Sequence, residues 1–329
     1  MMPITELVAL DAASPPPVAM QLADQWGWTE LEHFRSSDNH VFRGSGPTGL
    51  AFLRFAPQWH RDVAENSRIA RIARALAAAG AGVTTPIPTI RGEDVAITVC
   101  GATTYSGSSW TQLTGDILET DDLTAETAAE WGRALGRFHT ANPELPDAER
   151  GAPQLVDELR SAADDGQVPG SIRDHAARLV DLLCQLPHDA GVTGMIHGDP
   201  ELDNLCWLAA PASEPMWMDL DHFAHGWFAA DICFALRDLA PAVEPPDPQH
   251  PLVAGFLRGY GEVRPVSPDE HEWWPRFAAA HAVLTVVSVA HASGSVDPSW
   301  PEWAVGLQRR FDEIIVQTQN RLAAISPQL

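Results

Sequence analysis

The sequence predicts an α+β protein in which a small β-rich N-terminal region is followed by a larger, mostly helical region. Two observations support this prediction. Before residue 100, short apolar runs are bounded by Gly and Pro, which is typical of strands joined by tight turns. From residue 123 onward, apolar residues recur at three- and four-residue steps, which is typical of amphipathic helices. These patterns alone allow several α+β folds, and the sequence shows no internal repeat.

The first predicted elements are a helix and a hairpin. Residues 16–35 carry helical periodicity and then a polar loop, and strands are predicted at 40–43 and 50–55. The turn between these strands, residues 44–49, spells Gly-x-Gly-x-x-Gly. A dinucleotide-binding version of this motif leads from a strand into a helix, whereas this one lies between two strands and contains a proline. We therefore interpret it as a hairpin turn.

A helix and two further strands complete the predicted N-terminal region. The helix covers residues 60–79 and ends where Gly residues follow it. An edge strand is expected at 86–88, because its two Pro residues exclude a central position, and another strand is expected at 95–99. Residues 100–110 are dense in Gly, Ser and Thr, so we expect a hinge there.

The hinge divides the chain into two predicted domains, one over residues 1–108 and the other over residues 109–329. The second domain contains a predicted hairpin at 194–220 and a proline-rich break at 241–251. Its helices are predicted at 123–140, 153–163, 171–186, 228–239, 252–260, 268–292 and 300–324.

Composition limits the class of protein. At 329 residues, with 45% hydrophobic and 20% charged residues, the chain has the composition of a globular protein. No apolar run approaches the roughly 20 residues that span a bilayer, so we expect no membrane partner. The N-terminus lacks a basic segment followed by an apolar one, and the four Cys residues have no paired spacing. We therefore expect a cytoplasmic protein with reduced thiols.

Charge limits the partners and the chemistry. All 21 basic residues are Arg, and the absence of Lys excludes a lysine nucleophile, Schiff base or phosphate clamp. The net charge of −23 is uneven, because residues 1–108 contain 8 Arg and 10 acidic residues, whereas residues 109–329 contain 13 Arg and 34 acidic residues. Such a field repels nucleic acid and anionic membranes, so no nucleic-acid partner is expected. The acidic region either steers a cationic substrate or is a solubilising surface.

One motif carries a specific chemical signal. An apolar, strand-like run leads into His197-Gly198-Asp199, and Asn204 follows five positions after the aspartate. A second apolar run leads into Asp219. Phosphoryl transfer requires a group that orients or deprotonates the attacking hydroxyl, and oxygen ligands that hold Mg²⁺ on the nucleotide phosphates. A carboxylate, an amide and a second carboxylate are side chains that suit these tasks.

This arrangement resembles the catalytic core of the aminoglycoside phosphotransferase/choline kinase family, in which His-Gly-Asp is followed by Asn at the same spacing and then by an apolar strand and Asp. The resemblance covers nearly the whole chain. It implies a protein-kinase-like bilobal fold with a small β-rich N-lobe and a larger, mostly helical C-lobe. It also implies that Asp199 is the catalytic base, that Asn204 and Asp219 bind Mg²⁺, and that His197 is a structural residue of the loop.

The resemblance further implies that the N-lobe binds the nucleotide. It places a basic, phosphate-contacting residue at Arg54, with an outward-facing structural Arg as the alternative. The family's phosphate-covering loop corresponds to the loop that contains Ser36 and Ser37. A helix carboxylate would pair with the basic residue, and Glu65 is the only Glu in that helix. The family's position falls on Ile69, however, so this ion pair is either shifted by one turn or absent.

Other polar residues follow the motif. Asp221 lies two positions after Asp219 and would share its face if the segment is extended, where it would support the metal site or pair with an Arg. Asp231 matches the family's helix aspartate that braces the catalytic loop. His222 and His225 suggest a transition-metal site as an alternative, although phosphoryl transfer calls for hard oxygen ligands.

The predicted function is Mg²⁺-dependent transfer of the nucleotide γ-phosphate to a hydroxyl of a small-molecule acceptor. ATP is the expected donor, with GTP as the alternative. The expected acceptor is an aminoglycoside or another amine-bearing alcohol, such as choline or homoserine. Trp273 and Trp274, with neighbouring acidic residues, either contact this acceptor or belong to ordinary helix packing. The alternatives are a kinase for protein Ser/Thr, a catalytically weak kinase-like binding or regulatory module, and a metal-dependent hydrolase. The sequence indicates no oligomeric state.

Overall fold

The computed structural model describes residues 1–10, 15–47, 49–141, 153–208, 214–241 and 243–325. Within this part of the chain the residues form two compact units. Unit 1 comprises Met1–Ala77, Thr84–Leu113 and His291–Phe311, and unit 2 comprises Ala78–Val83, Thr114–Ala290 and Asp312–Leu329. The boundary between residues 108 and 109 stays a prediction. Thr48 of the predicted turn and residues 209–213 of the predicted hairpin lie outside the described residues.

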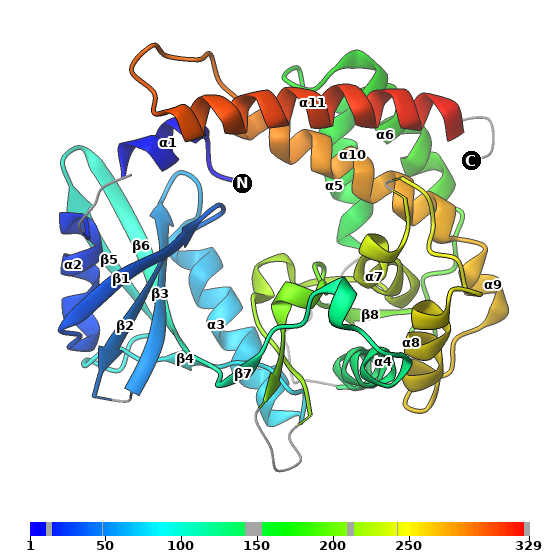
Figure 1. Cartoon of the computed structure of the whole chain (residues 1–329), viewed down its shortest axis with the longest axis horizontal. Coiled ribbons are helices and arrows are strands. Elements are labelled where there is room, and N and C mark those ends of the chain that lie inside the picture. The colour runs from blue at the N-terminus through cyan, green and yellow to red at the C-terminus, as the bar shows by residue number, and fades with distance from the viewer. Residues whose placement is uncertain (11–14, 48, 142–152, 209–213, 242, 326–329) are drawn as a thin grey trace. The chain divides into compact units, whose positions relative to one another are not determined.

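Unit 1 is built on an antiparallel sheet with the strand order β1-β2-β3-β6-β4, in which β5 also pairs with β6 (Figure 1). The strands predicted at 40–43 and 50–55 are confirmed as β2 and β3, whose register pairs Gly46 with Gly49 across the hairpin turn. The strands are β1 (Glu30–Ser36), β2 (His40–Gly46), β3 (Gly49–Pro57), β4 (Pro86–Ile87), β5 (Val95–Cys100) and β6 (Thr103–Thr111).

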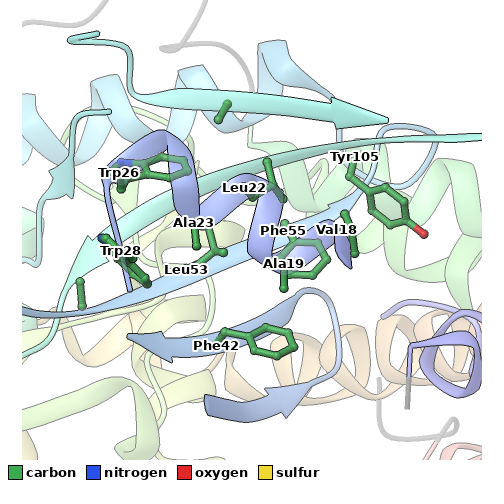
Figure 2. Close-up of a cluster of buried hydrophobic side chains, with 12 residues drawn as sticks. Val18, Ala19, Leu22, Ala23, Trp26, Trp28, Phe42, Leu53, Phe55 and Tyr105 are labelled. Carbon is green, nitrogen blue, oxygen red and sulfur yellow. The ribbon is translucent and has the colours of Figure 1, made fainter. Parts of the chain in front are cut away.

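Helix α2 (Pro17–Ala23) covers one face of this sheet, and helix α3 (Val63–Ala78) covers the other (Figure 1). The side of α3 follows from the hydrogen bond between Asn66 and Ser106, since Ser106 alternates with Tyr105 along β6. On the α2 face, apolar side chains form a buried cluster, which Figure 2 shows. It contains Val18, Ala19, Leu22, Ala23, Trp26, Trp28, Phe42, Ala51, Leu53, Phe55, Ala96 and Tyr105.

Trp28 explains the glycine-rich turn. A Cβ atom built on Gly44 would lie 2.3 Å from the Trp28 ring, and one on Gly46 would lie 2.5 Å from it. Any side chain at these positions would collide with the buried indole. The glycines therefore make room for an aromatic core residue, and the prediction of a hairpin turn is confirmed.

Two predictions about unit 1 are wrong. Residues 30–36 form edge strand β1, where the sequence predicted the end of a helix and a loop. Most of the β1 side chains are exposed, so the strand lacks the apolar alternation that identifies a half-buried strand. The predicted hinge at 100–110 instead contains most of β6, which pairs with β3, β4 and β5. Small residues suit this central strand, because a Cβ on Gly107 would lie 2.9 Å from Phe55.

Unit 2 is mostly helical, as predicted. Helices α4 and α8 cross closely because glycines lie at the contact. A Cβ on Gly132 would be 2.0 Å from the carbonyl oxygen of Phe256, and one on Gly259 would be 1.9 Å from that of Ala129. The helices of unit 2 are α4 (Ala125–Thr140), α5 (Gln154–Asp164), α6 (Gly170–Leu183), α7 (Phe228–Ala235), α8 (Pro251–Gly261), α9 (Pro268–His271) and α10 (Trp274–Ala292). Helix α1 (Ile4–Ala9) belongs to unit 1, and helix α11 (Glu302–Ile325) has residues in both units.

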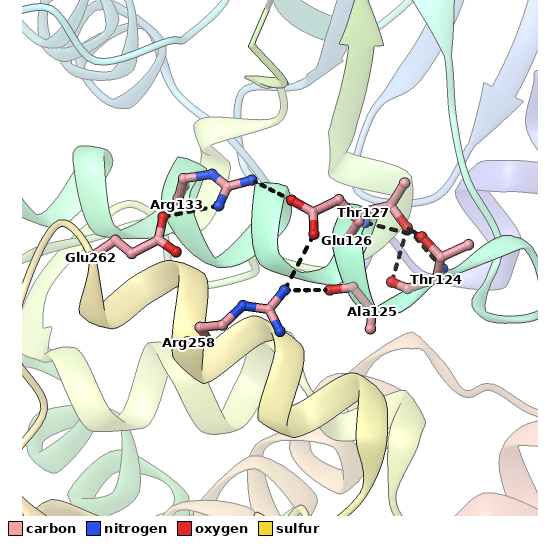
Figure 3. Close-up of polar contacts among 7 residues, drawn as sticks. All are labelled: Thr124, Ala125, Glu126, Thr127, Arg133, Arg258 and Glu262. Carbon is pink, nitrogen blue, oxygen red and sulfur yellow. Dashed lines mark hydrogen bonds and ion pairs between the residues drawn. The ribbon is translucent and has the colours of Figure 1, made fainter.

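Ion pairs also join α4 to α8 (Figure 3). Arg133 on α4 lies 2.9 Å from Glu262 and 3.4 Å from Glu126, and Arg258 on α8 lies 3.4 Å from Glu126. The glutamates are exposed, and exposed pairs typically contribute less than about 1 kcal/mol. The close approach of the two helices therefore depends on the glycines more than on these charges.

Short antiparallel strands complete unit 2 and carry the motif residues. Strand β8 (Thr193–Ile196) pairs with β11 (Ala224–Trp227). Strand β9 (Leu205–Leu208) pairs with β10 (Met216–Trp217) and with β7 (Gly115–Asp116). Among the helices of the described residues, none combines the length and the apolar character that crossing a bilayer requires.

Candidate active site

Gly198 shapes the loop that follows β8. Its φ of 83° lies in the left-handed region, and a Cβ atom there would lie 2.0 Å from the carbonyl oxygen of His222. Glycine is the residue that tolerates both conditions. The chain therefore turns sharply against the short helix η5 (Leu220–His222), and the next residue, Asp199, remains half-buried, with 28% of its side chain exposed.

Asp231 on α7 holds the backbone of this loop. Its fully buried carboxylate accepts hydrogen bonds from the N–H groups of His197 and Gly198, each at 2.9 Å. His139 Nε2 contacts the same carboxylate at 2.9 Å, and His139 Nδ1 contacts the Tyr260 hydroxyl at 2.7 Å. Burial lowers the pKa of His139 below its usual value, so the ring is neutral at pH 7. Residues of α4, α7 and α8 thus converge on one loop.

His197 is packed between the rings of Phe138 and Trp217. Its Nε2–H donates to the carbonyl oxygen of Met218 at 2.9 Å, and its Nδ1 accepts from the backbone N–H of Asp199 at 3.4 Å. Both ring nitrogens are therefore engaged by backbone groups, one of the loop and one of the segment that follows β10. This geometry suits a structural residue better than a general base.

Asn204 lies beside Asp199. It ends the short helix η4 (Leu202–Asn204), and its Nδ2 donates to the Asp199 carbonyl oxygen at 2.9 Å and to Asp199 Oδ2 at 3.2 Å. Because the amide nitrogen faces Asp199, the amide oxygen points away from it. The backbone N–H of Met218 donates to the Asn204 carbonyl oxygen at 2.8 Å, which brings the end of β10, and so Asp219, alongside Asn204.

Asp219 has a left-handed backbone, with φ 55° and ψ 67°. The prediction that Asp219 and Asp221 share one face of an extended segment is therefore wrong, because residues 220–222 form η5. Left-handed conformations are uncommon for residues other than glycine, and they cluster at functional sites. The turn explains why strand periodicity fails at this point.

The donors in this loop suit magnesium. The amide oxygen of Asn204 and the carboxylate of Asp219 are hard oxygen ligands on neighbouring segments, and Mg²⁺ usually adds water and substrate phosphates to one or two protein ligands. Within the part of the chain that the structure describes, no group of three or more His, Cys, Asp or Glu side chains is arranged to hold a metal ion. The residues present therefore fit an ion that is shared with a phosphate-bearing ligand.

A cationic residue that the sequence analysis missed lies against Asp199. Arg237 Nη2 is 3.1 Å from Asp199 Oδ1 and also contacts Glu201 Oε2. Arg237 begins the short helix η6 (Arg237–Leu239), which follows α7. The sequence does not single out Arg237, because all basic residues of the chain are Arg. The contact also joins residues that are far apart in sequence.

A pocket of about 200 Å³ opens beside Asp199, and all of its lining residues belong to unit 2. Asp199, Gly198 and His222 contribute to its wall, together with side chains of α5, β11, α7 and α10. The α10 residues are not those that the sequence suggested, because Trp274 is buried in the core. The polar residues of the helices around the pocket are Gln154, Glu158, His281, Thr285 and Ser288.

The pocket holds one carboxyl group besides that of Asp199. Glu158 Oε1 accepts a hydrogen bond from Gln154 Nε2 at 2.7 Å. Desolvation of this carboxyl raises its pKa, although the residue as a whole is exposed, and the hydrogen bond from Gln154 and the nearby His222 oppose the shift. Burial and, second, the charge of Arg237 lower the pKa of His281 to about 3, so its imidazole is neutral at pH 7. The pocket therefore combines a desolvated carboxyl with a neutral ring.

The predicted phosphate-contacting residues lie in unit 1. Arg54 on β3 pairs in register with Ser108 on β6, so it lies on the α3 face of the sheet. At the end of β1, where the turn to β2 begins, the Ser36 hydroxyl lies 3.0 Å from His33 Nε2 and 3.0 Å from His40 Nδ1. Ser37 follows it, and its carbonyl oxygen accepts from the backbone N–H of Met2 at 2.9 Å.

Helix α3 departs from the expected carboxylate pattern. Glu65 is exposed and lies 3.9 Å from Arg61, one turn earlier on the same side of the chain. Ile69, the position that the resemblance indicated, is buried. Between these two positions, Asn66 points to the sheet and donates to Ser106 at 3.0 Å. A neutral amide therefore occupies the helix face on which the family pattern has a carboxylate.

Comparisons with known proteins agree with this architecture. Residues 30–266 match the family model described as the phosphotransferase enzyme family, APH. Similar solved structures include an amicoumacin kinase in complex with AMP-PNP and Ca²⁺ (TM-score 0.70, 18% identity, covering 91% of this chain and 92% of that one). They also include a microcompartment-associated aminopropanol kinase (TM-score 0.63, 16% identity, 93% and 97%) and a choline/ethanolamine kinase family protein from Mesorhizobium loti (TM-score 0.54, 16% identity, 98% and 99%). They confirm the predicted kinase-like fold. No curated protein matches the sequence.

Proposed function

Since the chain belongs to the phosphotransferase enzyme family, we propose that it transfers the γ-phosphate of ATP to a hydroxyl group of a compact, amine-bearing small molecule. The observation that carries this proposal is the pairing of Asp199 with Asn204 on a loop held by Asp231, beside a pocket that Asp199 itself lines. In this proposal, Asp199 would be the proton acceptor and Asn204 an oxygen ligand beside the space that an acceptor would occupy.

Asp199 acts as the proton acceptor in this proposal. A hydroxyl in the pocket donates to its carboxylate, and the proton moves to Asp199 as the hydroxyl oxygen bonds to the γ-phosphorus. The bond between that phosphorus and the β–γ bridging oxygen breaks, and ADP leaves. The buried bonds from Asp231 to the loop keep the Asp199 backbone in place during this step. Most of the rate enhancement in phosphoryl transfer comes from such positioning and from charge stabilisation.

Asn204 and Asp219 would hold the divalent ion, Mg²⁺ by the chemistry of the donors. When bound, such an ion neutralises charge on the nucleotide phosphates. In unit 1, Arg54 and the loop of Ser36 and Ser37 would contribute to nucleotide binding, with ATP as the expected nucleotide and GTP as the alternative.

A carboxyl group in the pocket supports an amine-bearing acceptor, and the volume of the pocket supports a compact one. The Glu158 carboxyl lines the pocket and burial raises its pKa, so an ammonium group in the pocket would stabilise its charged form. A volume of about 200 Å³ suits a compact molecule better than a large multi-ring one. The structural neighbours named for aminopropanol and for choline or ethanolamine act on small amino alcohols by their names.

Substitution of the proposed base tests the reaction. We expect Asp199→Asn to lower phosphate transfer from labelled ATP by about 10³-fold, because the amide keeps the shape but does not take up the proton. Asp203→Asn makes the same change on an exposed residue of η4 and should leave the rate within about twofold. Equal rates in wild type and Asp199→Asn, over a panel of amino alcohols and neutral alcohols, would contradict the proposal.

A second pair of variants tests the acceptor class. Glu158→Gln should raise the KM for an amino alcohol about tenfold and leave the KM for its deaminated analogue unchanged, because one charge-assisted contact is lost. Asp157→Asn removes the neighbouring exposed carboxylate, which pairs with Arg160, and serves as the control. If both acceptors respond equally to Glu158→Gln, the pocket does not recognise the amine.

One observation favours a different function, that of a nucleotide-binding module with little catalysis. Asn66 stands on the α3 face on which the family pattern has a carboxylate, and the chain contains no Lys. In that case ATP would bind in a calorimetric titration, while neither transfer nor hydrolysis would change in Asp199→Asn. The same variant therefore separates the two functions.

A further inference from the structure

We propose that Arg237 is a positioning residue for Asp199, which sets the orientation of the carboxylate that accepts the proton. The proposal rests on the proposed function, because it assigns Arg237 a part in the same reaction. It starts from the contacts of Arg237 with Asp199 Oδ1, at 3.1 Å, and with Glu201 Oε2.

Arg237 is itself held in place. Its Nη1 donates to the carbonyl oxygen of Phe234 at 3.0 Å, near the C-terminal end of α7, where a positive charge also complements the helix dipole. Only 22% of its side chain is exposed. The same segment of chain therefore holds the loop twice, through Asp231 at the backbone and through Arg237 at the side chain.

The two oxygens of Asp199 have different partners. Arg237 contacts Oδ1, and Asn204 Nδ2 donates to Oδ2 at 3.2 Å. Contacts on both oxygens fix the rotation of the carboxylate, so that its remaining lone pairs keep one direction relative to the pocket. A general base must hold such an orientation to within a fraction of an ångström, because small displacements cost large factors in rate.

Charge gives a second reason for the role of Arg237. Asp199 and Glu201 are two residues apart and meet the same guanidinium group. Without this cation the two carboxylates would repel each other, and Asp199 would turn away or lose its contact with Asn204. The planar fork of Arg can face two carboxylates at once, whereas the ammonium of Lys is a single point charge.

Arg133 provides a matched control. It also contacts two carboxylates, Glu126 and Glu262, and 25% of its side chain is exposed (Figure 3). It lies on α4 and does not line the pocket. A variant of Arg133 therefore reports what the loss of a comparable ion pair does to the fold alone.

Steady-state kinetics of ATP with a responsive acceptor test the proposal. We expect Arg237→Gln to lower kcat about 100-fold with both KM values within about threefold, and Arg237→Lys to recover part of kcat. Arg133→Gln should keep kcat within about twofold. In the Arg237→Gln background, Glu201→Gln should raise kcat several-fold, because it removes the unbalanced neighbouring charge. A kcat for Arg237→Gln equal to that of Arg133→Gln, or a loss confined to KM, overturns the proposal.

Crystal structures of the wild type and Arg237→Gln give a readout that does not depend on activity. We expect the contact between Asp199 Oδ2 and Asn204 Nδ2 to be lost in the variant, while the bonds from Asp231 to the loop remain. An unchanged contact between Asp199 and Asn204 overturns the proposal. A wild-type protein that transfers phosphate to no acceptor contradicts the proposed function instead, and the two crystal structures then decide the positioning role.

Discussion

The loop that carries Asp199 in unit 2 and the loop that carries Ser36 in unit 1 are held in different ways. In the Asp199 loop the main partners, Asp231, Met218 and Arg237, come from other elements of unit 2. In the Ser36 loop, the serine hydroxyl lies between two histidines of the strands that the loop itself joins. The first loop is held through a fully buried carboxylate, whereas the second combines contacts within its own hairpin with contacts from Met2 to Ser37 and from His60 to Asp38.

This difference has consequences for mutation. Where side chains from several elements share one buried carboxylate, the loss of one group leaves several donors without a partner. At Ser36, the loss of the hydroxyl removes a partner from the exposed His33 ring and from one nitrogen of the buried His40 ring, so fewer buried groups lose a partner. We therefore expect substitutions around Asp199 to change stability and activity together, and substitutions at Ser36 to have smaller effects.

The largest effect is expected for Asp231→Ala. The change leaves the N–H groups of His197 and Gly198 and the ring of His139 without their buried acceptor, which should cost about 3–5 kcal/mol in the free energy of unfolding. Urea denaturation measures it. The exposed residue Asp238, on η6, provides the control Asp238→Ala, which should stay within about 0.5 kcal/mol. A loss below about 1 kcal/mol in Asp231→Ala would show that the loop does not depend on this carboxylate.

Gly198→Ala should be the next most damaging change. The new Cβ would meet the His222 carbonyl oxygen and would also need a left-handed backbone, so we expect a loss of about 2–4 kcal/mol together with most of the transfer activity. Gly261→Ala, at the end of α8, is the control, since nothing lies within 4 Å of a Cβ there. Thermal unfolding of both variants in parallel measures the difference. Equal melting temperatures would mean that the loop adapts.

In unit 1, Arg54→Gln sharpens the comparison. If Arg54 contacts the nucleotide phosphates, the KM for ATP should rise about tenfold, which corresponds to about 1.4 kcal/mol, with kcat nearly unchanged. Ser36→Ala, in the local loop, should change the same KM less than about twofold. A larger effect of Ser36→Ala than of Arg54→Gln would reverse the assignment.

The pocket in unit 2 predicts a pH dependence. His281 has a pKa of about 3 in the folded protein, whereas an unfolded chain binds this proton below about pH 6.5. The neutral His281 ring makes its full contribution to the free energy of unfolding above pH 6.5. This contribution is lost as the pH falls from 6.5 toward 3, by at most about 1.4 kcal/mol per pH unit. Urea denaturation at a series of pH values between 7.5 and 5 should show that the free energy of unfolding depends less steeply on pH in His281→Gln than in wild type.

The smallest effect is expected for Glu65→Gln. Its side chain is 43% exposed and lies 3.9 Å from the buried Arg61, which is a long contact. The free energy of unfolding should therefore change by less than about 0.5 kcal/mol, and the KM for ATP by less than about twofold. A marked increase in the KM for ATP would instead support the predicted role of Glu65 at the nucleotide. Isothermal titration with an ATP analogue gives an independent measure of the same interaction.

The sequence was most informative where residue type and spacing act over a short range. Gly198 is required by a local turn and a close backbone contact, and the polar residues from Asp199 to Asn204 follow one another within a single loop. Periodicity also located the long helices, because their buried faces repeat every turn. It failed for β1, whose exposed side chains carry no such pattern, and for β6, whose small residues resemble a linker.

By itself, the sequence determined the α+β class, the main helices, and a loop able to combine a carboxylate, an amide and a tight glycine turn, because these depend on propensity and near neighbours. Only the tertiary structure decided that Arg237 meets Asp199, that Glu158 shares a pocket with it, and that Asn66 occupies the inner face of α3. These contacts join residues far apart in the chain. They exist because helix packing brings the residues together, and local sequence carries no record of which distant side chain will be its neighbour.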